Sequence, residues 1–260
     1  MEWYLYLAAF VGGFFAGGIN TLAGNGSVIT LTILTELVGL PGNMANATNR
    51  IGIVAQSLAS IGAYYRNGVL KLERSRTIIL LVLAGSVGGI YTAMQVSNEQ
   101  FLGALRFLMV LMLFVIVIRP ERWLRESDVT RKLPLWAATP LFLAIGFYGG
   151  FIQMGMGIFF LAIMVLAARY SMLESNVVKI TVTALYTMLA VAIFQFNSMV
   201  SWPAGLSIAF GQALGGYFSA SFASRHPKAN VLAHRVLIFV VVASTLQLFG
   251  VPAAIVRLLD

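Results

Sequence analysis

The chain has 260 residues, of which 59% are hydrophobic and only 10% are charged. Soluble domains carry about 25% charged residues, so this composition excludes an ordinary soluble protein and predicts one surrounded mostly by lipid. The net charge of +8 lies mainly in short loops, where basic residues set membrane topology, so nucleic-acid binding is not expected. The absence of cysteine excludes disulfides and thiol-based metal sites.

Apolar runs follow one another along the whole chain, and a membrane-spanning helix needs about 20 such residues. The runs lie at about 3–23, 28–40, 45–65, 76–95, 99–118, 135–153, 157–172, 177–196, 203–222 and 231–256. They predict an all-α, polytopic membrane protein with a single transport domain. The only sustained polar stretch, about 119–134, is interpreted as a linker between two halves, about 1–118 and 135–260. The start of the chain lacks a basic region before its apolar residues and is expected to be retained rather than cleaved.

A glycine-rich interruption occurs in the first apolar run of each half, over residues 12–26 and again over residues 146–157. Each glycine costs a helix about 1 kcal/mol relative to alanine, so both runs should break. Irregular backbone inside a membrane is tolerated only where it is buried in protein or lines a polar cavity. Repeated breaks therefore predict a binding site at the membrane midplane. The alternative is that the same glycine pattern forms only a kinked and tightly packed helix. Ser27 is expected to cap the segment after the first break, and Asn46 or Thr48 the third segment.

Other features recur in the same order in both halves. Residues 45–50 are matched by 175–179, and residues 85–91 by 212–217. The paired glycines of the latter motif are expected to serve close helix packing rather than ligand binding.

Loop charges predict that the two halves have opposite orientations. The loop after the third segment holds four basic residues, whereas its counterpart at 197–202 holds none; the next pair of loops reverses this pattern. Because basic loops stay in the cytoplasm, equivalent segments should point in opposite directions, with the linker inside and both termini outside. Each half then contains either five spans or three spans plus a re-entrant hairpin, and the sequence leaves both geometries open.

Two basic residues interrupt the apolar runs at corresponding places, Arg50 in the third segment and Lys179 in its counterpart. Ionisable residues at membrane depth are rare and usually functional. The alternative is that both side chains snorkel to the nearest interface. No aspartate or glutamate lies deep in any predicted span, so the pattern favours an anionic rather than a cationic substrate.

Enzyme chemistry has little support. The two histidines, His226 and His234, lie in loop or near-interface positions, and an intramembrane protease using Ser27 would lack a positioned base. No His, Asp and Glu cluster suggests a metal site. No catalytic residue, metal or cofactor is therefore predicted.

The motif at residues 17–27, followed by the polar helix start at 45–50, resembles the sulfite exporter TauE/SafE family of membrane anion permeases. The resemblance covers essentially the whole chain and is weaker in the second half. It implies export of sulfite, organosulfonates or other small organic anions across a bacterial cytoplasmic membrane. Asn25 stands where family members often have glycine, and the second half has Val178 and Lys179 at the helix start.

The sequence thus predicts a transporter with a small anionic substrate, embedded in a lipid bilayer, whose homo-oligomeric state is left open. Two alternatives remain: a channel for another organic anion or a neutral solute, and a protein without transport activity. The predicted substrate-binding residues lie at the two breaks and at the starts of the two polar segments. They are Asn20, Thr21, Gly24, Asn25, Gly26, Ser27, Asn46, Thr48, Asn49, Arg50, Gln153, Gly155, Gly157 and Lys179.

Overall fold

The computed structural model describes residues 3–22, 24–117 and 134–226, and these residues form helices without any β-strand. The first half contains α1 (Trp3–Leu22), α2 (Ser27–Thr32), the π-helical turn η1 (Ile33–Leu37), α3 (Gly42–Arg66), the short η2 (Glu73–Ser75), α4 (Arg76–Gln95) and α5 (Asn98–Val117). The second half contains α7 (Leu135–Phe151), α8 (Met156–Ala162), the π-helical turn η3 (Ile163–Ala167), α9 (Met172–Phe196) and α10 (Trp202–Arg225). The expected helical class is confirmed.

The order of elements in the first half recurs in the second. Both α1 and α7 end at an irregular segment, and both are followed by a short helix that runs into a π-helical turn. The next helix, α3 or α9, has 25 residues in each half. At about 1.5 Å per residue, α2 and η1 together are about 16 Å long, roughly half the thickness of a bilayer core.

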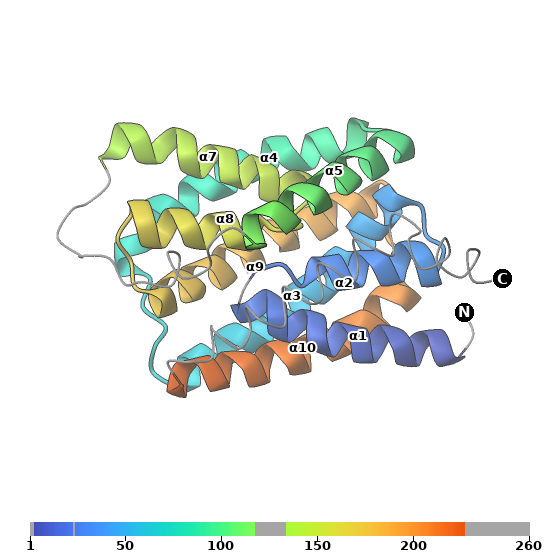
Figure 1. Ribbon diagram of the computed structural model, residues 1–260, viewed down its shortest axis with the longest axis horizontal. Helices are drawn as coiled ribbons and strands as arrows, with labels where there is room; N and C mark the ends of the chain where they lie inside the picture. Colours follow the sequence, from blue (N-terminus) through green and yellow to red (C-terminus); the bar gives the residue numbers. More distant parts are fainter. Residues whose placement is uncertain (1–2, 23, 118–133, 227–260) are drawn as a thin grey trace.

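The helices are arranged in three layers (Figure 1). α4 and α7 lie along one side of the molecule, α1 and α10 lie along the opposite side, and α3 and α9 run between them. The first helix of each half thus packs against the third long helix of the other half.

Glycines make these two outer interfaces close. On each of the four helices, two glycines four residues apart meet the backbone of the partner helix, where an added Cβ would collide. In the α1–α10 pair these are Gly13 and Gly17 facing Ile208 and Gln212, and Gly211 and Gly215 facing Phe10 and Phe14. In the α4–α7 pair they are Gly146 and Gly150 facing Val82 and Ser86, and Gly85 and Gly89 facing Leu143 and Phe147. Close backbone approach through small residues is the usual way in which helices associate in membranes. Gly89 and Gly215 therefore serve helix packing, as the sequence predicts.

Basic residues mark one end of the long helices. At this end Arg66 donates to the hydroxyl of Tyr217 at 3.2 Å, and Arg225 donates to the side-chain oxygen of Asn67 at 3.2 Å. The segment just before α9 reaches the same end, since the Tyr170 hydroxyl donates to the carbonyl of Arg74 at 2.9 Å.

At the opposite end, the described loops at 96–97 and 197–201 contain no basic residue. There the amide of Asn197, just after α9, approaches the sulfur of Met94 near the end of α4 at 3.4 Å. The first residue of α3, Gly42, donates its backbone N–H to Asn98. α3 therefore ends where α9 begins, and the two helices run in opposite directions.

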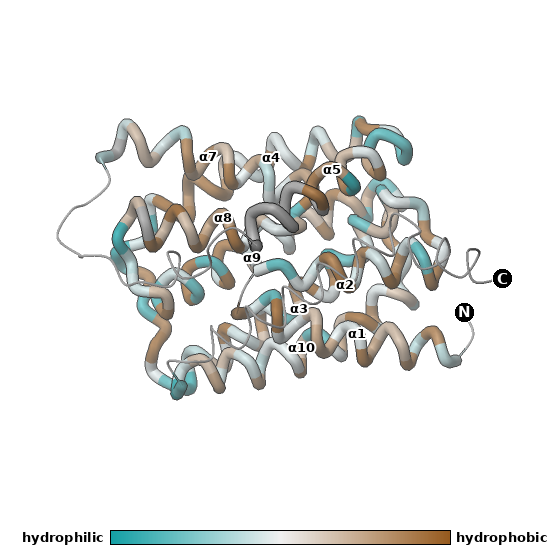
Figure 2. The backbone as a smooth tube through the Cα atoms, viewed as in Figure 1, coloured by the Kyte–Doolittle hydropathy of each residue, from teal (hydrophilic) through white to brown (hydrophobic). Residues whose placement is uncertain are grey.

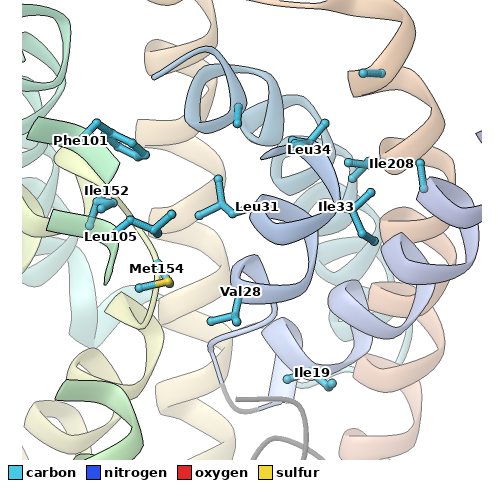
Figure 3. Packing of buried hydrophobic residues seen from close by; sticks show 13 residues of the cluster. Ile19, Val28, Leu31, Ile33, Leu34, Phe101, Leu105, Ile152, Met154 and Ile208 are labelled. Atoms are coloured by element: carbon cyan, nitrogen blue, oxygen red, sulfur yellow. The ribbon is translucent and has the colours of Figure 1, made fainter. Parts of the chain in front are cut away.

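Hydrophobic packing fixes the short return helix α2 with η1 (Figure 3). Leu31 points toward Leu105 and Ile152 on one side, whereas Ile33 and Leu34 lie beside Ile208 of α10 on the other. Burial on both sides explains how so short a helix, which would be marginal alone, keeps its place.

By length and composition, three helical segments of the described chain can cross a membrane: Trp3–Leu22, Glu73–Gln95 and Met172–Phe196. Hydrophilic residues are most evident near the helix ends and at a few places inside the helical layers (Figure 2).

Some sequence expectations are wrong in detail. Gly26, not Ser27, precedes α2, and it provides no side-chain cap. α3 begins at Gly42, so Asn46 and Thr48 lie inside the helix rather than at its N-terminus. The last predicted segment, 231–256, and all of the predicted linker except residue 134 lie outside the described residues.

Candidate functional site

The two glycine breaks meet in the interior of the molecule. Gly24 has a φ of +83°, and an added Cβ on it would collide with the backbone of Gly157; the reverse substitution would collide with Gly24. In the second break, Gln153 and Gly155 have φ values of 61° and 75°. Left-handed backbone at both breaks ends the first helix of each half and turns the chain back.

Lys179, two turns into α9, binds the end of α1. Its ammonium group donates to the carbonyls of Asn20 at 3.1 Å and Thr21 at 2.8 Å, and to the side-chain oxygen of Asn176 at 2.8 Å. An ammonium has three hydrogens, so these acceptors use all of them. The side chain is 2% exposed and does not snorkel to an interface.

Arg50, two turns into α3, binds the end of α7 in the same way. Its guanidinium donates to the carbonyls of Gly149 at 2.8 Å and Gly150 at 2.9 Å, with a longer contact to Phe151 at 3.4 Å. It also donates to the side-chain oxygen of Gln153 at 2.6 Å. Arg50 is fully buried.

The two cations therefore act reciprocally: each half supplies the cation that binds the last carbonyls of the other half's first helix. Those carbonyls have no partner within their own helix and carry the negative end of the helix dipole. The sequence placed both cations at membrane depth but did not reveal these partners.

A small cavity lies where the breaks meet. Five of its lining residues belong to the predicted set: Asn20, Gly24, Gln153, Gly157 and Lys179. Four more were not predicted: Met156, Ile180, Thr183 and Tyr186. Lys179, Thr183 and Tyr186 follow one another at helical spacing, so one face of α9 forms much of the wall.

A hydrogen-bonded polar cluster leads from the cavity into the interface of α1 with α3. The amide of Asn20 donates to Gln56 at 2.8 Å, Gln56 donates to the hydroxyl of Thr21 at 3.1 Å, and that hydroxyl lies 3.1 Å from the hydroxyl of Ser60. Gln56 and Ser60 could not be recognised from the sequence alone. Each is an isolated polar residue in an apolar helix, and its partners become known only from the packing of that helix against its neighbours.

The remaining predicted residues surround the breaks without lining the cavity. Asn49 accepts a 2.6 Å hydrogen bond from Thr30 of α2, and Asn46 donates to the carbonyl of Phe151 at 3.1 Å. Thr48 accepts from the backbone of Ser201 at 3.0 Å and so holds the loop before α10.

Within the first break, Gly26 packs against the backbone of Ala16. Ser27 and Asn25 are buried, and neither polar atom of the Asn25 amide has a hydrogen-bond partner among the described residues. Substrate contact at these positions stays a prediction.

The charge balance of the interior is positive. All four acidic residues of the described segments, Glu36, Glu73, Glu99 and Glu174, are exposed, whereas Arg50 and Lys179 are buried. The described residues contain no cluster of three or more His, Asp or Glu that could hold a metal ion. The arrangement can stabilise negative charge and offers nothing comparable to a cation.

Comparison with known proteins places the chain in a family. The model of the sulfite exporter TauE/SafE family matches residues 9–248. The chain belongs to this family. It is also 27% identical over 259 residues to a protein of Sinorhizobium sp. named probable membrane transporter protein ORF9, covering 98% of this chain and 95% of that protein. A probable membrane transporter protein of Haemophilus influenzae is 26% identical over 214 residues, covering 80% of this chain and 81% of the relative. No solved structure gives a significant match.

Membership of the TauE/SafE family and the names of these relatives identify the chain as a membrane transporter.

Proposed function

We propose that the protein exports a small sulfur-containing anion, sulfite or an organosulfonate, across the bacterial cytoplasmic membrane. The site is the cavity between the two breaks, where buried cations and amides replace the water that surrounds a sulfur oxyanion. The name of the family to which the chain belongs, sulfite exporter TauE/SafE, supports the substrate class.

One observation carries the proposal: a buried cation binds the helix end at each of the two breaks, and every acidic residue of the described segments is exposed. Uncompensated buried charge is costly. Helix-end carbonyls offset part of this cost, and an anion in the cavity would offset more of it. A cationic substrate would instead meet like charge in a low-dielectric site.

The proposed topology is a pair of inverted repeats, about 1–118 and 135–260, each with three spans and one re-entrant hairpin. The opposite directions of α3 and α9, the repeated glycine interfaces and the short helices α2 and α8 support it. Basic residues gathered at the end marked by Arg66 and Arg225 favour a cytoplasmic location for that end. Both termini would then lie in the periplasm.

Export needs no second ion in this mechanism. A monoanion that leaves a cell with a negative interior gains about 2.3 kcal/mol per 100 mV. The absence of buried carboxylates from the described segments is compatible with transport that lacks a carboxylate proton relay.

The test is efflux of radiolabelled sulfite and methanesulfonate from proteoliposomes that hold a defined membrane potential. We expect the wild-type flux to rise with an inside-negative potential, and Arg50→Ala and Lys179→Ala to reduce it at least about tenfold, the loss that 1.4 kcal/mol produces. Arg106→Ala, which removes an exposed cation from α5, is the matched control. Unchanged flux in both Arg50→Ala and Lys179→Ala would refute the electrostatic role.

A further inference from the structure

The hydrogen bonds of the two buried cations fix the orientation of two amide side chains. Lysine and arginine have only donors, so an amide bonded to either must offer its oxygen. Arg50 holds the oxygen of Gln153 at 2.6 Å, and Lys179 holds the oxygen of Asn176 at 2.8 Å. In both amides the NH₂ group is therefore turned away from the cation.

The NH₂ group of Gln153 belongs to a residue that lines the cavity, whereas Asn176 lies next to the lining residues without being one of them. Gln153 lines the cavity and is 5% exposed. Asn176 is 1% exposed, lies one turn before the cavity residue Ile180 on α9, and its NH₂ nitrogen has no hydrogen-bond partner in the described part of the chain. A buried donor without a partner is destabilising, and a bound acceptor would remove that cost.

The cations themselves have little left to offer a ligand. All three hydrogens of Lys179 go to acceptors of the protein, and the two terminal nitrogens of Arg50 both donate to protein oxygens. The Nε–H of Arg50 has no partner among the described residues, but Arg50 does not line the cavity, so hydrogen bonds to a ligand there come from other groups.

We propose that the NH₂ groups of Gln153 and Asn176 are the direct hydrogen-bond donors to the transported oxyanion, and that Arg50 and Lys179 are positioning residues that lock these amides as donors. Asn176 is a binding residue that neither the sequence nor the family match assigns. The proposal rests on the proposed transport of an anion and specifies how that anion is recognised.

Asn46, which corresponds to Asn176 in the first half, has the opposite amide orientation. Asn46 occupies the fifth position of α3, as Asn176 does in α9. Its NH₂ group donates to the carbonyl of Phe151 at 3.1 Å, and its oxygen is the unpartnered atom. Asn46 therefore offers an acceptor, and only the amide held by Lys179 offers a free donor.

The experiment is isothermal titration of the purified full-length protein with sulfite and with methanesulfonate. Gln153→Glu and Asn176→Asp keep the size of the side chain and pair with Arg50 and Lys179, so the fold should be retained, with a melting temperature at least equal to that of the wild type. Affinity should fall about ten to a hundredfold, because a donor is replaced by a repelling acceptor. Asn67→Asp, at an amide that accepts from Arg225 outside the cavity, should bind as the wild type does.

Two further variants separate the loss of a donor from added charge. Gln153→Met and Asn176→Leu are neutral and should each lose at least about tenfold in affinity, measured below their melting temperatures. Lys179→Arg, which is also donor-only, should restore binding relative to Lys179→Gln. The effects of Lys179→Gln and Asn176→Leu should be non-additive, because the lysine acts through the amide.

The outcomes distinguish this inference from the function on which it rests. If the wild type binds neither probe, the proposed anion function fails. If the wild type binds but Gln153→Met and Asn176→Leu bind equally well, the anion function stands and the donor assignment is overturned.

Discussion

The break after α1 is surrounded by hydrogen-bonded polar side chains, whereas the break after α7 is surrounded by methionine and aromatic side chains. Asn20 and Thr21 belong to the cluster with Gln56 and Ser60. On the other side, Met154 and Met156 are buried in hydrophobic clusters. The backbone features, by contrast, are common to both: a left-handed glycine, a short return helix and a cation from the opposite half.

The shared features of the two breaks are those that the fold requires, and the polar cluster found at the first break is the feature that a ligand would require. A helix that ends inside a membrane protein must have its last carbonyls satisfied, and each half solves this with a buried cation. The polar cluster is not needed for that purpose, since the second break lacks its counterpart. We infer that the polar cluster of the first break adds to the polar surface of the transport path beside the donors proposed at Gln153 and Asn176.

The largest expected effect comes from the contact between the two breaks. Gly24→Ala introduces a Cβ at a left-handed position and against the Gly157 backbone, so we expect a loss of at least about 3 kcal/mol in unfolding free energy. Thermal unfolding in detergent measures it. Gly62→Ala, in α3 with open space around it, should be neutral or stabilising. Equal melting temperatures for the two variants would mean that the breaks do not touch.

Removal of the cations compares the two helix ends directly. Arg50→Met leaves three carbonyl contacts and Gln153 without their donor, whereas Lys179→Met leaves two carbonyls and Asn176. We expect losses of about 3 and about 2 kcal/mol, since each buried acceptor left alone costs about 1–3 kcal/mol before relaxation. Denaturant unfolding of both variants shows which one loses more unfolding free energy. A larger loss at Lys179 would contradict the count of acceptors.

The polar cluster should contribute less to stability than the cations. Thr21→Val removes the hydroxyl that connects Gln56 to Ser60, and we expect a loss of about 1–2 kcal/mol. Thr187→Val is the control in the second half, because the Thr187 hydroxyl has no partner among the described residues. Its replacement should be neutral or slightly stabilising. A greater loss at Thr187 than at Thr21 would reverse the asymmetry described above.

The smallest effect concerns the contact between Thr48 of α3 and the loop before α10. Thr48→Val removes the acceptor of the Ser201 backbone N–H, and we expect a loss of about 1 kcal/mol. The corresponding position of α9 is already apolar, Val178. Hydrogen exchange at Ser201 should accelerate in the variant. Unchanged exchange there would show that Thr48 does not hold the loop.

The breaks and the buried cations could be predicted from the sequence because local chemistry reveals them. Glycine-rich interruptions recur visibly, and a basic residue within an apolar run stands out whatever its partners. The snorkelling alternative was wrong for both cations, since Arg50 and Lys179 are almost completely inaccessible.

The partners of these residues could not be predicted, because they depend on how distant helices are placed. Arg50 binds carbonyls about a hundred residues away along the chain, and nothing local to position 50 indicates them. Thr183 and Tyr186 could not be singled out, because they lie in the apolar part of α9 and only the placement of the other helices brings them to the cavity. The run at 28–40 read as one segment, whereas the helix ends at Leu37 and Gly39 turns the chain with a φ of 75°.

The most direct test of the central claim is the sign of the transported charge. Proteoliposomes adsorbed on a solid-supported membrane should give a current that carries negative charge in the direction of an imposed methanesulfonate gradient, and Arg50→Ala and Lys179→Ala should abolish it. A cationic current, or an anionic current that both variants leave intact, would contradict an anion site built on these two residues.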